Sequence, residues 1–181
     1  MKKSILAVLL MIGLVVPAFC ETLEVVGKAG YGVNAKIDGS GGLTMDVDSP
    51  FVLGAEGYMY LLPSVGIGAG ISNVFDSKVK NPAGVKIGMT NIYVSVKPKI
   101  GFIADVYLLG QFGYGLVRVS DVEKVDSGIY WGAGAGIELM SWIVEVVYSN
   151  NKMTVKPGPS DPAFDVTHSM VTLNVGYKFA I

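Results

Sequence analysis

Seven charged side chains stand where the sequence alternates between bulky apolar residues and small ones. Each falls on the side of the small or polar residues, although Glu145 shares its face with Ile143 and Val147, so all seven would face one interior if these segments were β-strands. A buried charge must be paired, because an unpaired one is strongly destabilising. Charges grouped in this way suit a structural ionic plug, which we favour, or a narrow ion or proton path, or a pair of catalytic carboxylates. The seven are Glu24, Lys28, Glu56, Lys97, Glu138, Glu145 and Lys178.

Counting residues from the shorter connections gives these charges approximate heights. Glu24, Glu145 and Lys178 each lie about three residues from the same end, on segments that would be neighbours in a closed sheet. We therefore expect Lys178 to lie between Glu24 and Glu145. Lys28 and Glu56 lie at matching heights on adjacent segments, and we expect them to pair.

His168 and Ser169 are the residues that would suggest hydrolase chemistry. Adjacent residues of a strand point to opposite faces, so the two side chains should diverge, and no Asp or Glu follows them in the chain. We expect no catalytic residues, and we expect His168, the only histidine, at the rim near the long loops. One histidine argues against a transition-metal site. The aspartates of the first long loop lack EF-hand spacing, so we expect neither a metal nor a cofactor; they are Asp38, Asp46 and Asp48.

The N-terminus predicts a secretory signal peptide over residues 1–20. A basic start precedes the apolar stretch 5–16, which is too short to span a bilayer as a helix, and a small-x-small cleavage site precedes Glu21. A lipoprotein interpretation of Cys20 is weaker, because Phe19 stands where that processing site requires a small residue. Cleavage removes the only cysteine, so no disulfide is expected, and two of the 14 basic side chains, which leaves 12 against 15 acidic ones. This slightly negative balance argues against a nucleic-acid partner.

Residues 21–181 predict one all-β domain. Eight segments alternate with a period of two, which is typical of strands whose faces meet different environments. Short connections at 63–64, 103–105 and 140–141 alternate with long ones. The long connections are expected at 36–50, 76–88, 119–128 and 150–166. The predicted strands are 22–35, 51–62, 65–75, 89–102, 106–118, 129–139, 142–149 and 167–181.

One face of each predicted strand is bulky and apolar, and the other is rich in glycine. In 22–35, for example, Leu23 and Tyr31 alternate with Glu24, Lys28 and Asn34. An eight-stranded barrel is just wide enough inside for side chains to fill it, so the small residues should face inward. The bulky outer surface would aggregate in water but suits lipid. Aromatic residues of this face should form interfacial girdles; they are Tyr31, Phe51, Phe75, Tyr114, Trp131, Trp142, Tyr148 and Phe179.

The composition agrees with strands that cross a membrane. Hydrophobic residues make up 51% of the chain and the mean hydropathy is +0.50, yet beyond the N-terminal stretch no apolar run approaches the length of a transmembrane helix. Only helices and closed barrels satisfy every backbone group in lipid. The sequence therefore predicts an eight-stranded, antiparallel, up-and-down transmembrane β-barrel.

The last segment carries a pattern that resembles the C-terminal assembly signal of outer-membrane β-barrels. The matching residues are Asn174, Gly176, Phe179 and Ile181, and the departure is at the end, where such proteins most often have Phe or Trp. With the strand pattern and the loop order, the chain resembles the small OmpA/OmpX-like outer-membrane barrels. This resemblance implies insertion by the barrel-assembly machinery and contact with outer-membrane lipid and lipopolysaccharide. It also implies short turns and both termini on the periplasmic side.

Three functions are compatible with these features. The resemblance favours a non-enzymatic barrel that stabilises the outer membrane or contacts a surface ligand through its long loops. Lys78, Lys80 and Lys86 in the second long loop would be suited to lipopolysaccharide phosphates. A lipid-modifying enzyme, as in a few related barrels, would need a Ser–His–acid set on one face. A soluble, lipocalin-like ligand-binding barrel would need the bulky face inside.

Overall fold

The computed structural model describes residues 23–39, 44–80, 85–100, 105–120, 124–156 and 162–180. The predicted signal peptide and Ile181 lie outside this part of the chain. No helix among the described residues is long and apolar enough to cross a membrane. The described residues form nine strands: β1 (Leu23–Gly39), β2 (Thr44–Asp46), β3 (Phe51–Leu62), β4 (Val65–Lys78), β5 (Lys86–Ile100), β6 (Asp105–Val119), β7 (Lys124–Leu139), β8 (Trp142–Lys156) and β9 (Phe164–Ala180).

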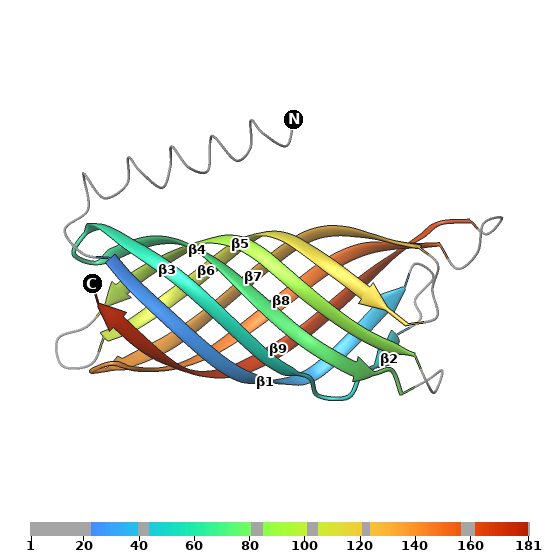
Figure 1. Cartoon of the computed structure of the whole chain (residues 1–181), viewed down its shortest axis with the longest axis horizontal. Helices are drawn as coiled ribbons and strands as arrows, with labels where there is room; N and C mark the ends of the chain where they lie inside the picture. Colours follow the sequence, from blue (N-terminus) through green and yellow to red (C-terminus); the bar gives the residue numbers. More distant parts are fainter. Residues whose placement is uncertain are drawn as a thin grey trace.

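Eight of these strands close into a cylinder (Figure 1). Each strand from β3 to β9 pairs antiparallel with the next along the chain, β1 pairs with β3, and β9 returns to pair with β1. The short β2 adds to the far end of β1. β1 begins and β9 ends at the same end of the cylinder. The predicted eight-stranded antiparallel barrel is confirmed.

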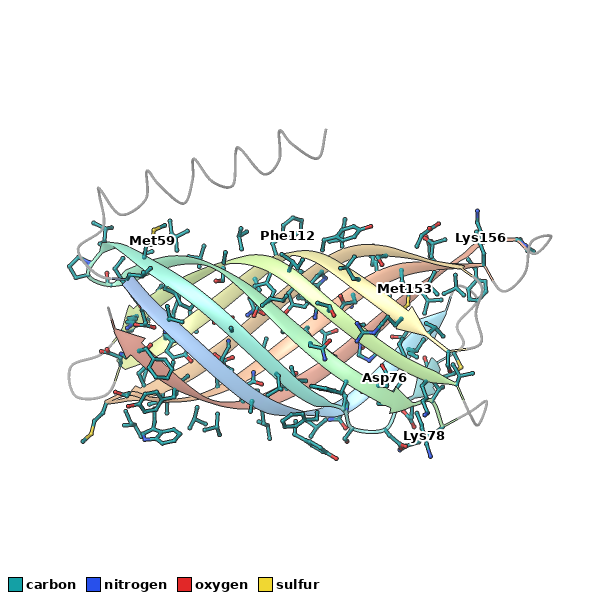
Figure 2. All side chains as sticks on the ribbon, in the orientation of Figure 1. Met59, Asp76, Lys78, Phe112, Met153 and Lys156 are labelled. Carbon is teal, nitrogen blue, oxygen red and sulfur yellow. The ribbon has the colours of Figure 1, made fainter. Side chains whose placement is uncertain are left out.

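The outer face of the barrel is a wide apolar belt. Outward residues such as Ile92, Val94 and Phe112 are half exposed or more, and Figure 2 shows Phe112 pointing away from the barrel wall. The belt extends from the turn Met140–Ser141 to the height of Trp131 and the aromatic residues around it. Within it, Asp105, the first residue of β6, is the only charged outward residue of the described strands. The bulky face therefore lies outside, and the soluble, lipocalin-like alternative is wrong.

The strands extend further at the long-loop end than the sequence predicted. β1 continues to Gly39, β8 continues to Lys156, and β9 begins at Phe164, inside segments expected to be loops. The register shifts between Val33 and Lys36 on β1, and similar shifts interrupt β4 and β7. Such β-bulges insert an extra residue and reverse the alternation. A strand that changes phase in this way no longer shows a continuous period of two.

Beyond the aromatic residues the barrel reverses its polarity. Inward residues become apolar and outward residues become charged, so that Met153 and Val155 of β8 lie inside while Lys152 and Lys156 point outward. We call this end of the barrel the collar. It comprises residues 34–39, 44–47, 76–80, 85–90, 116–120, 124–128, 150–156 and 164–169. Asp76, Lys78 and Lys156 mark it in Figure 2, at the opposite end from Met59.

The collar has its own apolar core, whereas the rest of the lumen is mostly polar. Ile37, Val79, Ile87, Met153 and Val166 are buried together inside the collar. This is the polarity of a soluble protein, with apolar residues inside and charges in water. The change from belt to collar therefore marks the height at which the barrel leaves the membrane.

Candidate functional site

The lumen below the collar contains two clusters of ionic side chains. The lower cluster, nearer the short turns, comprises Glu24, Lys97, Lys99, Glu138 and Lys178. Lys97 Nζ lies 2.8 Å from Glu24 Oε1 and also pairs with Glu138. Lys99 Nζ and Lys178 Nζ each lie 2.8 Å from Glu138 Oε2. Because these side chains come from β1, β5, β7 and β9, the cluster joins opposite walls of the barrel.

The upper cluster comprises Lys28, Glu56 and Glu145, which come from β1, β3 and β8. Lys28 Nζ lies 2.8 Å from Glu56 Oε1 and 2.7 Å from Glu145 Oε1. All three side chains are buried. The structure thus brings Lys28 to Glu56 as the sequence suggested, and adds Glu145 as a second partner of the same lysine.

Neutral donors complete the upper cluster. Glu56 accepts hydrogen bonds from the hydroxyl of Tyr58 at 2.6 Å, the hydroxyl of Tyr93 at 2.8 Å and Nε2 of Gln111 at 2.9 Å. Glu145 accepts further bonds at 3.0 Å from the Tyr107 hydroxyl and from Nδ2 of Asn174. Hydrogen bonds to a charged acceptor are stronger than neutral ones. These donors therefore compensate two carboxylates that share a single lysine.

The two clusters have opposite charge imbalances. The lower cluster has three lysines for two glutamates, and the upper cluster has one lysine for two glutamates. Four positive and four negative side chains therefore balance over the lumen. Lys97 lies between the clusters, with its Nζ 4.8 Å from the centroid of the Tyr58 ring and 4.6 Å from that of Tyr107. The two rings stabilise this cation and donate their hydroxyls to the upper carboxylates.

Glycines give the large polar side chains room inside the narrow barrel. A Cβ added at Gly70 would lie 2.7 Å from Glu56 Cγ and 2.7 Å from Cε2 of Tyr93. Such approaches are closer than real Cβ atoms tolerate. The alternation of glycine with bulky residues thus has a packing reason, since the inner face of each strand must accommodate side chains that cross the lumen.

The predicted contact of Lys178 with Glu24 is confirmed at 3.8 Å between Nζ and Oε2, but the prediction that Glu145 joins them is wrong. Glu145 stands opposite Asn174 on β9, and Asn174 stands opposite Gly30 on β1. Along the hydrogen-bonding direction Glu145 is therefore level with Gly30 rather than with Glu24. The strands of a closed barrel are tilted and staggered. Equal counts from the turn end consequently place residues at different heights on neighbouring strands.

The sequence prediction omitted Lys99 and the neutral donors. Lys99 is the next inward residue after Lys97 on β5, and continuing the alternation across Pro98 would have found it. The donors Tyr58, Tyr93 and Tyr107 also stand on the inner face of their strands. Their polar partners depend on contacts across the lumen, for which the linear sequence carries no direct signal.

His168 lies inside the barrel and not at the rim. It is 1% exposed, because β9 begins before it and carries it below the apolar core of the collar. Ser169 lies on the opposite face of the strand and is partly exposed. Neither ring nitrogen of His168 has a hydrogen-bond partner among the described residues, and the same holds for the amide group of its cross-strand neighbour Asn151.

A small polar cavity lies beside the upper cluster. Its volume is about 30 Å³, and Asn91, Ser149 and Thr172 are among the residues that line it. Asn91 Oδ1 and Ser149 Oγ have no hydrogen-bond partner among the described residues. The cavity has room for a water molecule, which would supply the missing bonds.

The residues matched to the assembly signal lie on both faces of β9. Phe179 is 55% exposed on the outer face, with its ring centroid 4.9 Å from that of Tyr177. Asn174 and Gly176 are inward, and Asn174 belongs to the hydrogen bonds of the upper cluster. Ile181 lies outside the described residues. No group of three or more His, Cys, Asp or Glu side chains in the described part of the chain has the geometry of a metal site.

The fold is similar to several solved outer-membrane barrels. Neisserial surface protein A matches with a TM-score of 0.57 and 14% identity, over 87% of this chain and 97% of that one. Ail of Yersinia pestis matches with a TM-score of 0.56 and 12% identity, over 88% and 99%. The outer membrane protein AlkL matches with a TM-score of 0.51 and 14% identity, over 90% and 92%.

The sequence comparisons place the chain in a family. None of the curated protein sequences compared with this chain matches it. The family described as the outer membrane protein beta-barrel domain matches residues 6–179, which is nearly the whole chain. Together with the apolar belt and the closed barrel, this match shows that the chain belongs to the outer membrane protein beta-barrel family and is a small β-barrel protein of the Gram-negative outer membrane.

Proposed function

We propose that this barrel is a non-conducting, non-catalytic scaffold in the outer membrane that presents its collar and long connections at the cell surface. The observation that carries this proposal is the pair of ionic clusters in the lumen, joined across it by Lys97–Glu24 in the lower cluster and by the Gln111–Glu56 hydrogen bond in the upper one. A barrel filled in this way leaves its outer face and its collar as the surfaces that other molecules can contact.

The orientation follows from the two ends of the barrel. The connections at Pro63–Ser64 and Met140–Ser141 are tight turns, and they lie opposite the collar. In outer-membrane barrels the short turns face the periplasm and the longer loops face outward. The collar then faces the cell exterior, and the start of β1 and the end of β9 face the periplasm.

The partners of the scaffold are outer-membrane lipid and lipopolysaccharide, and the assembly machinery during insertion. Lys78 and Lys86 are paired across β4 and β5 on the outer face of the collar, and both are exposed. Like charges directly opposite one another are unfavourable without an anion. Phosphate groups of lipopolysaccharide would provide that anion at the height where the belt ends. Ail has been crystallised with the heparin analogue sucrose octasulfate, and this polyanion is a suitable probe for the collar.

The enzymatic alternative lacks an assembled site among the described residues. His168 is buried in the lumen, and Ser169 faces the other side of β9. A nucleophile and its base must be within hydrogen-bonding reach of one another. This separation supports a non-catalytic role.

Cysteine labelling in intact cells tests the orientation on which the function rests. We expect Lys156→Cys, in the collar, to react with a membrane-impermeant maleimide on whole cells. Met140→Cys, 95% exposed in a short turn, should react only after the outer membrane is permeabilised. Wild-type protein is the control, because it remains unlabelled if Cys20 is removed with the signal peptide. Labelling of position 140 alone on intact cells would overturn the proposal.

A further inference from the structure

The collar contains a cavity that the scaffold function does not use. We propose that it is a binding site for one compact, uncharged hydrocarbon molecule about the size of a benzene ring. The cavity has a volume of about 180 Å³, and the ten described residues that line it are all apolar. They come from several strands of the collar and include Ile37, Ile87, Val119, Met153 and Val166.

The wall chemistry selects the class of ligand. An apolar-lined cavity of about 150 Å³ in another protein stays dry and binds benzene. The cavity of the collar is slightly larger and only partly enclosed, and its described walls are equally apolar. A charged or hydrogen-bonding molecule would lose its hydration there without gaining a polar partner, so it is excluded. The expected ligand is therefore a small aromatic or branched hydrocarbon.

The cavity is closed toward the membrane-embedded half of the barrel. On β8 the next inward residue below Met153 is Asn151, and on β9 the next below Val166 is His168. Both polar side chains are completely or almost completely buried, and the upper ionic cluster lies beneath them. A ligand would thus enter and leave at the collar end, and the cavity is a pocket rather than part of a channel.

Methionine methyl groups provide an internal readout. Met45 and Met153 line the cavity, whereas Met59 lies on the outer face of β3 and Met140 on a short turn (Figure 2 for Met59 and Met153). Protein with ¹³C-methyl methionine in lipid nanodiscs is titrated with benzene and, separately, with benzoate. We expect benzene to cause saturable shifts of the Met45 and Met153 signals, and benzoate to cause none. If benzene only partitions into the lipid, the Met59 signal should shift, and that shift should not saturate.

A pair of variants with the same chemical change separates binding from general perturbation. Val155→Phe fills the cavity and should abolish the saturable shift, whereas Val146→Phe places the same ring on the lipid-facing side of β8 and should preserve it. The chain's own connections are the competing occupant, and Leu43 and Val122 are their large apolar residues. Absence of a saturable Met153 shift in wild type overturns the proposal. A shift that appears only in Leu43→Ser/Val122→Ser protein identifies these connections as the occupant and overturns it equally.

Discussion

Lys97 on β5 and Glu24 on β1 meet across the lumen, with Lys97 Nζ 2.8 Å from Glu24 Oε1. Two further strands, β3 and β4, separate them along the barrel wall. The contact is therefore made through the interior and not between neighbouring strands. Above it, Lys28 on β1 pairs with Glu145 on β8, from which only β9 separates it along the barrel wall. The upper cluster crosses the lumen through neutral donors instead, because Tyr93 on β5 and Gln111 on β6 donate hydrogen bonds to Glu56 on β3.

Removal of the single upper lysine should be strongly destabilising. Lys28→Met leaves the buried carboxylates of Glu56 and Glu145 without a cation, and breaking a buried pair in this way costs about 3–5 kcal/mol. The free energy of unfolding, measured by urea denaturation in detergent, should fall by that amount. Lys152→Met, on the exposed outer face of the collar, is the matched control and should change it by less than about 0.5 kcal/mol.

The triple variant Lys28→Met/Glu56→Gln/Glu145→Gln should be much milder than Lys28→Met alone. It removes the charges together, so no uncompensated charge remains in the lumen. Equal losses for the single and the triple variant would show that the lysine contributes by packing and not by charge compensation.

Lys178→Met should have a smaller effect than Lys28→Met. Lys97 and Lys99 remain within the lower cluster to neutralise Glu24 and Glu138, and Lys178 is itself partly exposed. We expect a loss of about 1 kcal/mol or less, as for other partly solvated ion pairs. The same urea experiment gives the ranking, and the reverse order would contradict the assignment of three lysines to the lower cluster.

Tyr93→Phe tests the neutral donors. The substitution removes the hydroxyl that donates to Glu56 at 2.8 Å and keeps the ring, which packs 5.3 Å from that of Tyr130. A hydrogen bond to a charged group contributes about 1.5–3 kcal/mol, so the free energy of unfolding should decrease by that amount. Tyr148→Phe, on the lipid-facing surface, should leave it unchanged. A Tyr93→Phe barrel as stable as wild type would mean that Glu56 is satisfied without this bond.

Phe179→Asp should impair membrane assembly. Phe179 points outward in the last strand, and a charge on the lipid face costs roughly 2–4 kcal/mol at the bilayer midplane and less near the interface. Ala163→Asp, at an exposed position directly before β9 at the collar end, adds the same charge outside the belt and is the control. The yield of folded protein in the outer-membrane fraction, read from heat-modifiable migration on SDS gels, should fall for position 179 only. Equal yields of folded protein for the two variants would show that Phe179 is not part of the assembly signal.

The sequence predicted the barrel and most of its inner residues because the period of two is a local property. Asn34 shows where this inference ends. The alternation predicts Asn34 on the inner face, but its φ of 51° and the β-bulge around it bring Ala35 and Ile37 inside instead. A β-bulge changes which residues face inward without any change in composition. For the same reason, the alternation in the sequence did not reveal that the strands continue into the collar.

The sequence was a poorer guide to which lumen charges pair with one another than to which face of a strand each charge occupies. Counting along the chain predicts Lys178 as the partner of Glu145, whereas the stagger between strands sets Glu145 beside Lys28. The stagger is a property of barrel closure and not of any one segment. The collar cavity was missed for a related reason, since its walls come from segments whose alternation is interrupted.

Single-channel recording in planar bilayers tests the central claim most directly. Barrels that carry Lys156→Cys with a fluorescent label are inserted, so that their number in the bilayer is known, and an open porin serves as the positive control. If the two ionic clusters close the lumen, labelled barrels produce no discrete conductance steps in molar potassium chloride. Steady steps whose number follows the number of inserted barrels would contradict the account.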